Sequence, residues 1–492
     1  MIAGIDLGSN SFHMVVARVV GGRLHVIDRM REVVRLAAGL DERRQLKPEA
    51  KSRALACLKR FGQRLRGMPA SSVLAVGTNT FRQARKVRPF LQQAERALGH
   101  DIEVLAGREE ARLIYLGVAH DLPDAGGRRL VVDIGGGSTE CIIGERFDPV
   151  EADSLYMGCV AWSMRFFPEG RIREKSMREA EIAAGIELQP IQRRYRELGW
   201  KQCIGSSGTA LHIESILRAN GFSNDGITAK GLARLRRELV AAGRLDELRL
   251  RALEPDRLAV LPGGLAILSA IFEGLRIKRM RVSNGALREG LLYELVGRFR
   301  HEDVRDQTIA RLAEQHHVDL EQASRVEQVA VRLLAQTEHG ELGAEAEETR
   351  RTLSWAARLH EIGLSIAYAG YHKHSAYLVT HADMPGFSRD DQQELAAIIL
   401  GHRRRLPTAA FDELPSERKE RALHLCLALR LAVCLNRSRS QARLPVPRVE
   451  VRGRRWELGF DRRWLDQHPL TKADLREEAG RFEDAGLELR IH

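Results

Sequence analysis

Two short segments of the chain combine glycine, hydroxyl residues and an aspartate between apolar strands. The first is AGIDLGSNSFHMVV, with Asp6 ahead of its turn, and the second is LVVDIGGGSTECIIGE, with Asp133 in the same place. Glycine lets a backbone approach a ligand closely, and successive amide groups in such a turn bind anions. One such turn is also typical of an ordinary hairpin, but the repeat with its aspartate favours a phosphate site. The candidate phosphate ligands in the two turns are Ser9, Asn10, Gly135, Gly136, Gly137, Ser138 and Thr139.

Carboxylates accompany both turns. A lone acid beside a phosphate would repel it, so Asp6 and Asp133 indicate a Mg²⁺ ion between them. Glu140 starts the strand after the second turn and is placed to reach the metal or a water. The segment GREEARLIYLG puts Glu109 and Glu110 in the first turn of a helix, where acids also simply complement the helix dipole. We expect one of this pair to orient or deprotonate the water that attacks phosphorus.

Two further motifs are candidates for the same site. The turn GSSGT offers Gly205, Ser206 and Gly208 ahead of a helix, whose N-terminus would add free amide groups; a plain strand-to-helix connection is the alternative. Arg82, in GTNTFRQA, is a candidate for neutralising charge on the transferred phosphoryl group, although a single arginine in a turn is also a common structural feature.

These motifs need elements that hold them together, and strands alternate with helices over the first 300 residues, which predicts an α/β architecture. Residues 48–65 have apolar positions at helical spacing, and Gly21-Gly22 indicates a hairpin between the first strands. From 303 to 436 the periodicity is almost wholly helical, and RVEVRGRRWELGF follows as a second hairpin. The domains we expect are two similar lobes facing each other across a cleft, 1–124 and 125–300, then a helical domain, 301–440, and a small α/β unit, 441–492.

The composition limits the setting and the partners. The chain has 492 residues and a net charge of +12, and residues 401–463 hold 16 Lys and Arg against 7 Asp and Glu. Such a surplus favours a polyanion (nucleic acid, anionic lipid or polyphosphate) or is a solvated surface. An aromatic content of 5% argues against base-stacking platforms, so we expect no nucleic-acid partner.

Apolar runs and cysteines give an expected location. No apolar run approaches the roughly 20 residues of a spanning helix, and the six cysteines are scattered without a CxxC pair, as in a reducing cytosol. We expect a cytoplasmic protein with no transmembrane segment, and peripheral contact with the inner face of the cell membrane is left open.

The helical region holds its own set of chemical residues. His360-Glu361 is followed by His372, His374 and His402, and histidines on helices are typical of metal-dependent phosphohydrolases. Glu361 stands where the HD motif has aspartate. We therefore expect a metal site that has been lost or put to another use.

Taken together, the motifs resemble the exopolyphosphatase / guanosine pentaphosphate phosphatase family. The segments that carry the resemblance are GIDLGSNSFHMVV, GTNTFRQA, GREEARLIYLGVAH, VVDIGGGSTE, GSSGTALH and SNGALREGLLYE, and it continues through LHEIGLSIAYAGYHKHSAYLV and DMPGFSRDDQQELAAIILGHRR. The resemblance covers nearly the whole chain. It implies two actin-like (ribonuclease-H-like) ATPase lobes, followed by an all-α HD-like domain and a small C-terminal α/β unit. It also implies Mg²⁺-dependent removal of terminal phosphate from inorganic polyphosphate, or of the 5′ γ-phosphate from pppGpp.

Residue roles follow from the resemblance motif by motif. Glu110 matches the family's catalytic acid, and Arg82 matches the arginine of its T-x-R-Q-A turn. The positions that match the phosphate loops and their acids are Asp6, Ser9, Asn10, Asp133, Gly135, Ser138 and Glu140. In this family the helical domain is associated with dimerisation and with a channel for the polymer, so we expect a homodimer and polymer contacts at His374 and Arg403.

The choice of substrate depends on the charge surplus. A long polyanion gains from many distant cations, so the surplus in residues 401–463 favours a processive exopolyphosphatase. A pppGpp phosphohydrolase that makes ppGpp is the alternative. A non-catalytic (p)ppGpp-binding sensor is a third, disfavoured because Glu110 and both aspartates are present. A sugar kinase of the same fold is disfavoured because no sugar site is evident.

Overall fold

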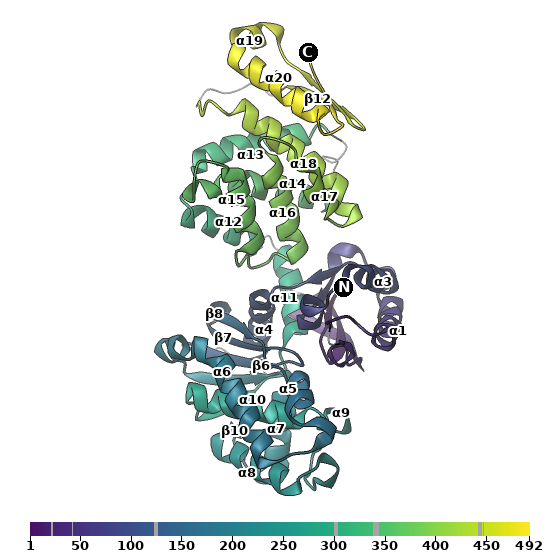
Figure 1. The fold of residues 1–492 in the computed structure, drawn as a ribbon, viewed down its shortest axis with the longest axis vertical. Coiled ribbons are helices and arrows are strands. Elements are labelled where there is room, and N and C mark those ends of the chain that lie inside the picture. The colour runs from purple at the N-terminus through teal and green to yellow at the C-terminus, as the bar shows by residue number, and fades with distance from the viewer. Residues whose placement is uncertain are drawn as a thin grey trace. The chain divides into compact units, whose positions relative to one another are not determined.

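The computed structural model describes residues 1–20, 23–41, 43–122, 126–299, 304–337, 344–440, 445 and 447–492. They form two compact units, Met1–Glu302 and Asp303–His492 (Figure 1). The turn expected at Gly21-Gly22 lies outside the described residues. The finer domain boundaries expected near residues 124 and 440 stay predictions.

The first sheet of the first unit begins as an antiparallel meander and ends with parallel strands. Its strands are β1 (Ile2–Leu7), β2 (Ser11–Val20), β3 (Arg23–Val33), β4 (Val73–Gly77) and β5 (Ile102–Val104). Their order is β3-β2-β1-β4-β5, with β4 parallel to β1. The first glycine turn therefore connects the central strand β1 to β2.

The second sheet repeats this plan. Its strands are β6 (Arg129–Ile134), β7 (Thr139–Glu145), β8 (Asp148–Leu155), β9 (Gln202–Ser206), β10 (Ile227–Thr228) and β11 (Arg279–Val282). The order β8-β7-β6-β9-β11 matches that of the first sheet, with β10 added at the edge. Asp6 on β1 is paired with His13, and Asp133 on β6 is paired with Glu140. The repeated motif in the sequence is thus a repeat of topology, and the first unit has the two actin-like lobes that we expected.

Helices cover both sheets. Those of the first unit are α1 (Pro48–Leu65), α2 (Asn79–Gln83), α3 (Arg88–Leu98), α4 (Gly107–Asp121), α5 (Cys159–Phe166), α6 (Glu174–Leu198), α7 (Ser207–Ala219), α8 (Ala229–Ala242), α9 (Pro255–Leu258), α10 (Leu261–Leu275) and α11 (Leu287–Phe299). α11 contacts β1 of the first sheet and also α4, which in turn contacts β7 and β8 of the second. At Gly290 a Cβ would lie 1.9 Å from the carbonyl oxygen of Leu113, so glycine is required where α4 and α11 cross. This tight crossing joins the two lobes and fixes the helix that carries Glu110.

The second unit is helical with a small sheet at its end, as expected. Its elements are α12 (Val304–Gln315), α13 (Leu320–Leu334), α14 (Ala344–Leu359), α15 (Tyr371–His381), α16 (Arg389–Gly401), α17 (Thr408–Asp412), α18 (Ser416–Leu435), β12 (Arg448–Arg452), β13 (Arg455–Gly459), α19 (Arg462–Gln467), α20 (Pro469–Glu483) and β14 (Glu488–Ile491). Trp456, Leu475 and Phe482 are buried in the same apolar core as the helices. The C-terminal sheet therefore shares a core with the helical domain.

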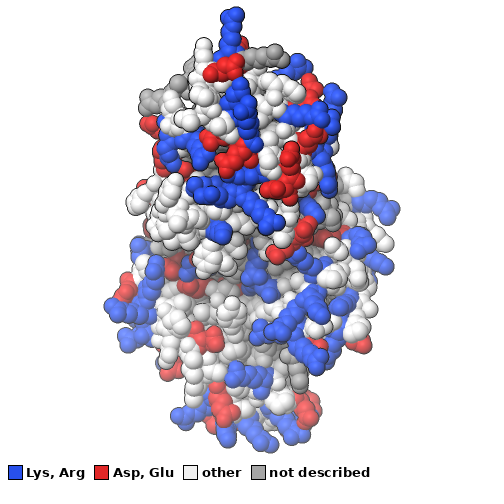
Figure 2. All heavy atoms as spheres, turned by 45° about the horizontal axis from the view of Figure 1, so that its top comes forward, with Lys and Arg blue, Asp and Glu red and all other residues white. Residues whose placement is uncertain are grey.

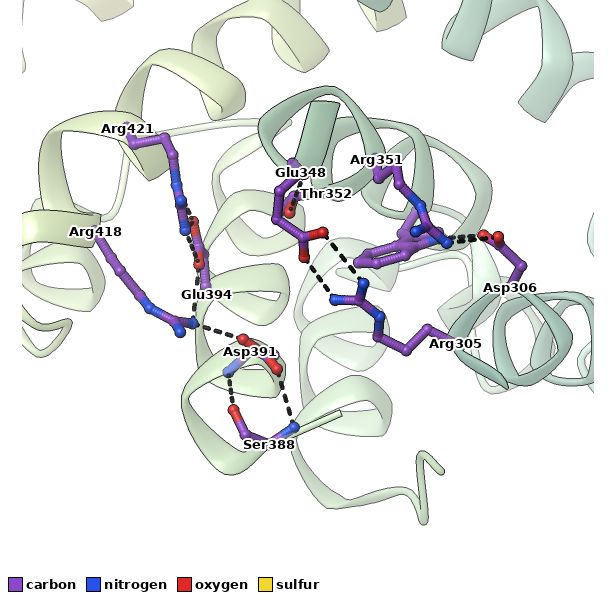
Figure 3. A network of polar contacts seen from close by, with 11 residues as sticks. Arg305, Asp306, Glu348, Arg351, Thr352, Ser388, Asp391, Glu394, Arg418 and Arg421 are labelled. Carbon is purple, nitrogen blue, oxygen red and sulfur yellow. Dashed lines mark hydrogen bonds and ion pairs between the residues drawn. The ribbon is translucent and has the colours of Figure 1, made fainter. Parts of the chain in front are cut away.

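Buried ion pairs connect the helices of the second unit (Figure 3). The carboxylate of Glu394, 3% exposed, accepts hydrogen bonds from the guanidinium groups of Arg421 and Arg418. Arg305 is paired with Glu348, and its guanidinium lies 4.5 Å from the centre of the Trp355 ring. Part of the positive charge in this unit is therefore neutralised within the fold.

Candidate active site

One cavity of about 410 Å³ in the first unit is lined by both glycine turns and by the start of α7. The predicted site residues in its lining are Asp6, Ser9, Asn10, Glu110, Asp133, Gly135, Gly136, Ser138, Glu140 and Gly208. The expected cleft between two similar lobes is present. Residues more than 200 positions apart in the chain meet in it.

The two turns present their amide groups in the same way. The carbonyl oxygens of Ser9 and Asn10 accept bonds of 2.7 to 3.0 Å from the segment after β3, and those of Gly135 and Gly136 accept bonds of 2.9 to 3.2 Å from the start of α5. Within the described chain, no hydrogen bond uses the amides of Ser9, Asn10, Gly136, Gly137 and Ser138. The hydrogen bonds to the carbonyl oxygens hold each turn in place. The free amide groups of the turns can then bind an anion.

Close packing of the turns against each other explains two of the glycines. A Cβ at Gly136 would lie 3.0 Å from the Cβ of Ser9, and one at Gly137 would lie 3.2 Å from the side chain of Asn79. None of the three glycines, 135 to 137, has a positive φ. These glycines allow the backbone to come close to a neighbour. We expected that neighbour to be a ligand, and the structure shows close approach to the first turn.

Asp133 and Glu140 are buried, and in the described chain neither they nor Asp6 is paired with a basic side chain. Burial, followed by the charge of Glu110, raises the pKa of Asp6 to about 8, and burial raises the pKa of Asp133 to about 6. Burial, then Glu110 and Asp133, raise the pKa of Glu140 well above its ordinary value. The Oδ1 atom of Asp6 is buried and has no hydrogen-bond partner. Such carboxylates fit a bound cation.

The donor set fits Mg²⁺ better than a fully protein-ligated metal. In the part of the chain that the structure describes, no three His, Cys, Asp or Glu side chains converge into a ready-made metal centre. Mg²⁺ usually binds through one or two carboxylates, with water and substrate phosphates completing its octahedron. Asp6 and Asp133 supply two such carboxylates, one from each lobe.

The structure separates the two adjacent glutamates at the start of α4. Glu109 accepts hydrogen bonds of 2.8 and 2.9 Å from Arg112, which also bonds to Glu294 on α11 at 2.6 Å, and all three are buried. Glu110 lines the cavity instead. The two acids therefore lie in different places: Glu109 belongs to the crossing of α4 and α11, and Glu110 faces the cavity that the phosphate turns line.

Arg82 lies behind Glu110. Its Nη1 donates to Glu110 Oε2 at 2.6 Å and to the carbonyl oxygen of Leu105 at 3.0 Å. It does not line the cavity. Glu140 is held by Ser154, whose hydroxyl donates to it at 2.8 Å. Ser154 also packs against Gly107, the first residue of α4, where an added Cβ would lie 2.7 Å from the Cβ of Ser154. These contacts hold the two glutamates in fixed positions.

Four of the predicted phosphate ligands lie outside the cavity lining. Ser206 donates to the carbonyl oxygen of Gly285 at 2.9 Å, and Thr139 donates to that of Met157 at 2.7 Å. A Cβ at Gly205 would meet Ala210 and Met280, both 2.8 Å away. The hydroxyls of Ser206 and Thr139 therefore bind carbonyl oxygens of the backbone, and Gly205 makes room for its neighbours. The fourth residue, Gly137, contacts Asn79.

Several lining residues were missed by the sequence analysis: His13, Arg29, Arg31, Thr78, Ser207, Arg257 and Arg288. Ser207 has φ of +80°, a strained value that is found mostly at functional sites. Arg29 and Arg31 alternate along β3 and therefore share one face, a spacing that was readable in the sequence. The guanidinium of Arg257 lies where a Cβ at Gly208 would be, about 2.0 Å away, which explains this glycine. The cavity thus has an acidic part and a basic part.

The predicted polymer contacts lie in the second unit. The guanidinium of Arg403 is 4.9 Å from the ring centre of Tyr371 and 5.6 Å from that of Tyr368. His374 lies on α15. Their contact with a polymer stays a prediction. On the face that Figure 2 shows, acidic side chains lie among the basic ones.

His360 lies beside a carboxylate, that of Glu361, which is already paired. Glu361 is bound by Arg439 at 2.6 Å, and His360 Nδ1 bonds to the carbonyl oxygen of Ala357 at 2.7 Å. The pKa of His402 is held well below its ordinary value, mainly by burial. The arginine at Glu361 takes the place that a cation would need.

Two other sequence expectations concern the whole chain. All six cysteines are buried and unpaired. Among the described residues, no helix has the length and apolar content needed to cross a membrane.

Comparison with known proteins covers both units. The model of the Ppx/GppA phosphatase family matches residues 15–299, and that of Ppx/GppA phosphatase domain III matches residues 304–479. The chain is 42% identical over 492 residues to the guanosine-5'-triphosphate,3'-diphosphate pyrophosphatase of Vibrio cholerae, covering 100% of this chain and 98% of that protein. It is 40% identical to the protein of the same name from Aeromonas hydrophila, with the same coverage.

Solved structures resemble a little more than half of the chain. An exopolyphosphatase from Cytophaga hutchinsonii is 26% identical with a TM-score of 0.55, over 60% of this chain and 97% of that one. A Ppx/GppA family member from Aquifex aeolicus is 25% identical with a TM-score of 0.50, over 61% of this chain and 98% of that one. The duplicated phosphate turns, the acids between them and these matches agree, and the chain belongs to the Ppx/GppA phosphatase family.

Proposed function

We propose that this protein hydrolyses the 5′ γ-phosphate of pppGpp and releases orthophosphate and ppGpp. The observation that carries the proposal is similarity of 40 to 42% over the full length to relatives named for guanosine-5'-triphosphate,3'-diphosphate. The similarity includes the helical unit, so it is not limited to the fold of the phosphate-binding lobes. The charge surplus favours polyphosphate over pppGpp, whereas the similarity to these relatives favours pppGpp.

Exopolyphosphatase activity is the second candidate. It is supported by the Cytophaga hutchinsonii structure, at lower identity and over a smaller part of the chain. The charge surplus between 401 and 463 supports it less than its count implies, because many of these arginines are paired. Paired members include Arg418, Arg421, Arg430, Arg437 and Arg439.

The acids and turns divide the work in this proposal. Asp6 and Asp133 would hold Mg²⁺ with Glu140 close by, and the ion would neutralise phosphate charge when bound. The free amides of the two turns bind the oxygens of the γ-phosphate. The arginines of the basic part, Arg29, Arg31 and Arg257, neutralise the remaining phosphates of the substrate.

Glu110 receives the proton of the attacking water. The water oxygen forms a bond to the γ-phosphorus, and the bond from that phosphorus to the bridging oxygen breaks. The bridging oxygen leaves with the electron pair as part of ppGpp. Arg82 holds Glu110 in the orientation that this proton transfer needs, through the 2.6 Å ion pair.

Product analysis tests the proposal. Purified protein with Mg²⁺ should convert pppGpp to ppGpp and orthophosphate in equal amounts, and a chelator should stop the conversion. Tight binding of pppGpp without release of orthophosphate would support the sensor alternative instead. The homodimer and the cytoplasmic location stay proposals, which sedimentation and fractionation would test.

A further inference from the structure

The cavity needs a cation for the transferred phosphoryl group, and the arginine expected there does not line the cavity. Arg82 is bonded to Glu110 and to the carbonyl oxygen of Leu105, and it lies outside the cavity lining. An arginine that neutralises developing charge must reach the reacting oxygens with free N–H groups. Arg82 therefore acts on Glu110, and the cation for the phosphoryl group has to come from another residue.

Arg288 is placed for this task. It lines the cavity from the first turn of α11, and its carbonyl oxygen lies 3.0 Å from where a Cβ at Gly4 of β1 would be. Its Nε donates to Glu289 at 3.0 Å and its Nη2 donates to the carbonyl oxygen of Asn284 at 3.2 Å. These bonds fix the guanidinium plane and leave Nη1 for a ligand.

The positions of the other lining arginines single out the same residue. The side chain of Arg29 is 52% exposed, Arg31 is also exposed, and the guanidinium of Arg257 lies against Gly208 at the start of α7. Arg288 is thus the guanidinium that acts between the two phosphate turns.

We propose that Arg288 is a catalytic residue that contacts the γ-phosphoryl group, and that Arg82 is a positioning residue for Glu110. This assignment rests on the proposed phosphohydrolase function. As the bond from phosphorus to the bridging oxygen breaks, an N–H of Arg288 donates to an oxygen that gains negative charge. No proton leaves the guanidinium in this step.

Kinetics of Arg288→Met and Arg288→Lys test the assignment on whichever of pppGpp and polyphosphate the wild type hydrolyses. We expect kcat to fall about 100-fold in Arg288→Met, the usual loss for one donor to a transition-state oxygen, with a smaller fall in Arg288→Lys. Arg281→Ala, an exposed arginine of β11, is the matched control and should behave as the wild type.

Titration with orthophosphate in the presence of Mg²⁺ gives a readout that needs no turnover. Arg288→Met should bind orthophosphate at least about tenfold more weakly than the wild type. If the wild type hydrolyses neither substrate, the proposed function fails, and this titration still decides the role of Arg288. Unchanged orthophosphate affinity, or a kcat within about threefold of the wild type in both variants, would overturn the assignment. Where Arg288→Met fails to fold, the same comparison is made with Arg288→Lys.

Discussion

The aspartates of the cavity and the buried glutamates of the second unit differ in their partners. In the second unit Glu394 is 3% exposed in its side chain and is bound by two arginines, and Glu478 is bound by the buried Arg430. In the described part of the first unit neither Asp6 nor Asp133 is paired with a basic side chain, and the buried Oδ1 atom of Asp6 has no hydrogen-bond partner. The fold supplies the countercharge for these glutamates and leaves it to be supplied at the aspartates of the cavity.

This difference separates structural acids from functional ones. A buried carboxylate that is paired with arginine costs stability when its partner is lost, because an uncompensated charge remains. A buried carboxylate without a partner already destabilises the folded state, and its presence is explained by a ligand that brings the charge. The same substitution, acid to amide, should therefore have opposite effects on stability at the aspartates of the cavity and at the paired glutamates of the second unit.

The largest effect is expected at the acid that acts on water. Glu110→Gln should lower kcat about 1,000-fold with little change in KM, because proton transfer to the carboxylate is lost while the turns still bind phosphate. The adjacent Glu109→Gln is the matched control: it should keep kcat and lose stability through Arg112. Steady-state kinetics with thermal melting of both variants checks this pair. A large kcat loss in Glu109→Gln and none in Glu110→Gln would reverse the roles.

Breaking a compensated acid should cost stability alone. Glu394→Gln leaves Arg418 and Arg421 without their carboxylate, and we expect a loss of about 3 kcal/mol in the free energy of unfolding of the second unit. Urea unfolding, followed by a probe in that unit, measures it. Hydrolytic activity below the transition should be that of the wild type. A neutral or stabilising effect would show that Glu394 is not the centre of the network.

Removing a buried acid that has no basic partner should instead stabilise the metal-free protein. Asp6→Asn removes a buried charge, so at pH 9 and without divalent cations the variant should be more stable than the wild type, by at least about 1 kcal/mol. It should also lose Mg²⁺-dependent hydrolysis. Thermal melting in a chelator, with and without added Mg²⁺, measures both states. Destabilisation of the metal-free protein would contradict the difference between the two units.

The pH dependence of stability should follow the same acids. Their ordinary pKa is 3.8, and the folded values are about 6 for Asp133 and about 8 for Asp6. Between these limits the folded state binds more protons than the unfolded state, so the stability of the metal-free protein should fall as pH rises from about 4 to about 8. Mg²⁺ should flatten the slope. Melting temperatures across this range, with Asp6→Asn as the control, test the sign; a rise with pH would contradict it.

Much of the fold could be predicted because the signals are local and repeated. The Asp-Gly-Ser turns are 127 residues apart, and their repetition indicated two lobes, while apolar spacing indicated α1 and the helical unit. The acids of the site could be named for the same reason. Residues on other elements could not be assigned this way: Arg288 reaches the cavity only because α11 crosses α4, and that crossing depends on contacts between distant segments.

The role of Arg82 shows another limit. From the sequence its charge and its position in a turn favoured contact with phosphate. Its actual partner, Glu110, is 28 residues away, and no spacing rule joins a residue after β4 to the start of α4. Thr139 and Ser206 were assigned from hydroxyl chemistry alone, and the structure uses both hydroxyls to bind carbonyl oxygens.

The central claim is tested most directly by the specificity of the purified protein. kcat/KM should be measured with Mg²⁺ for pppGpp and for long-chain polyphosphate, in one buffer and by the same orthophosphate assay. We expect kcat/KM for pppGpp to exceed that for polyphosphate by at least about tenfold, since it reflects differential binding of the transition state. A higher kcat/KM for polyphosphate would contradict the proposed function and restore the exopolyphosphatase.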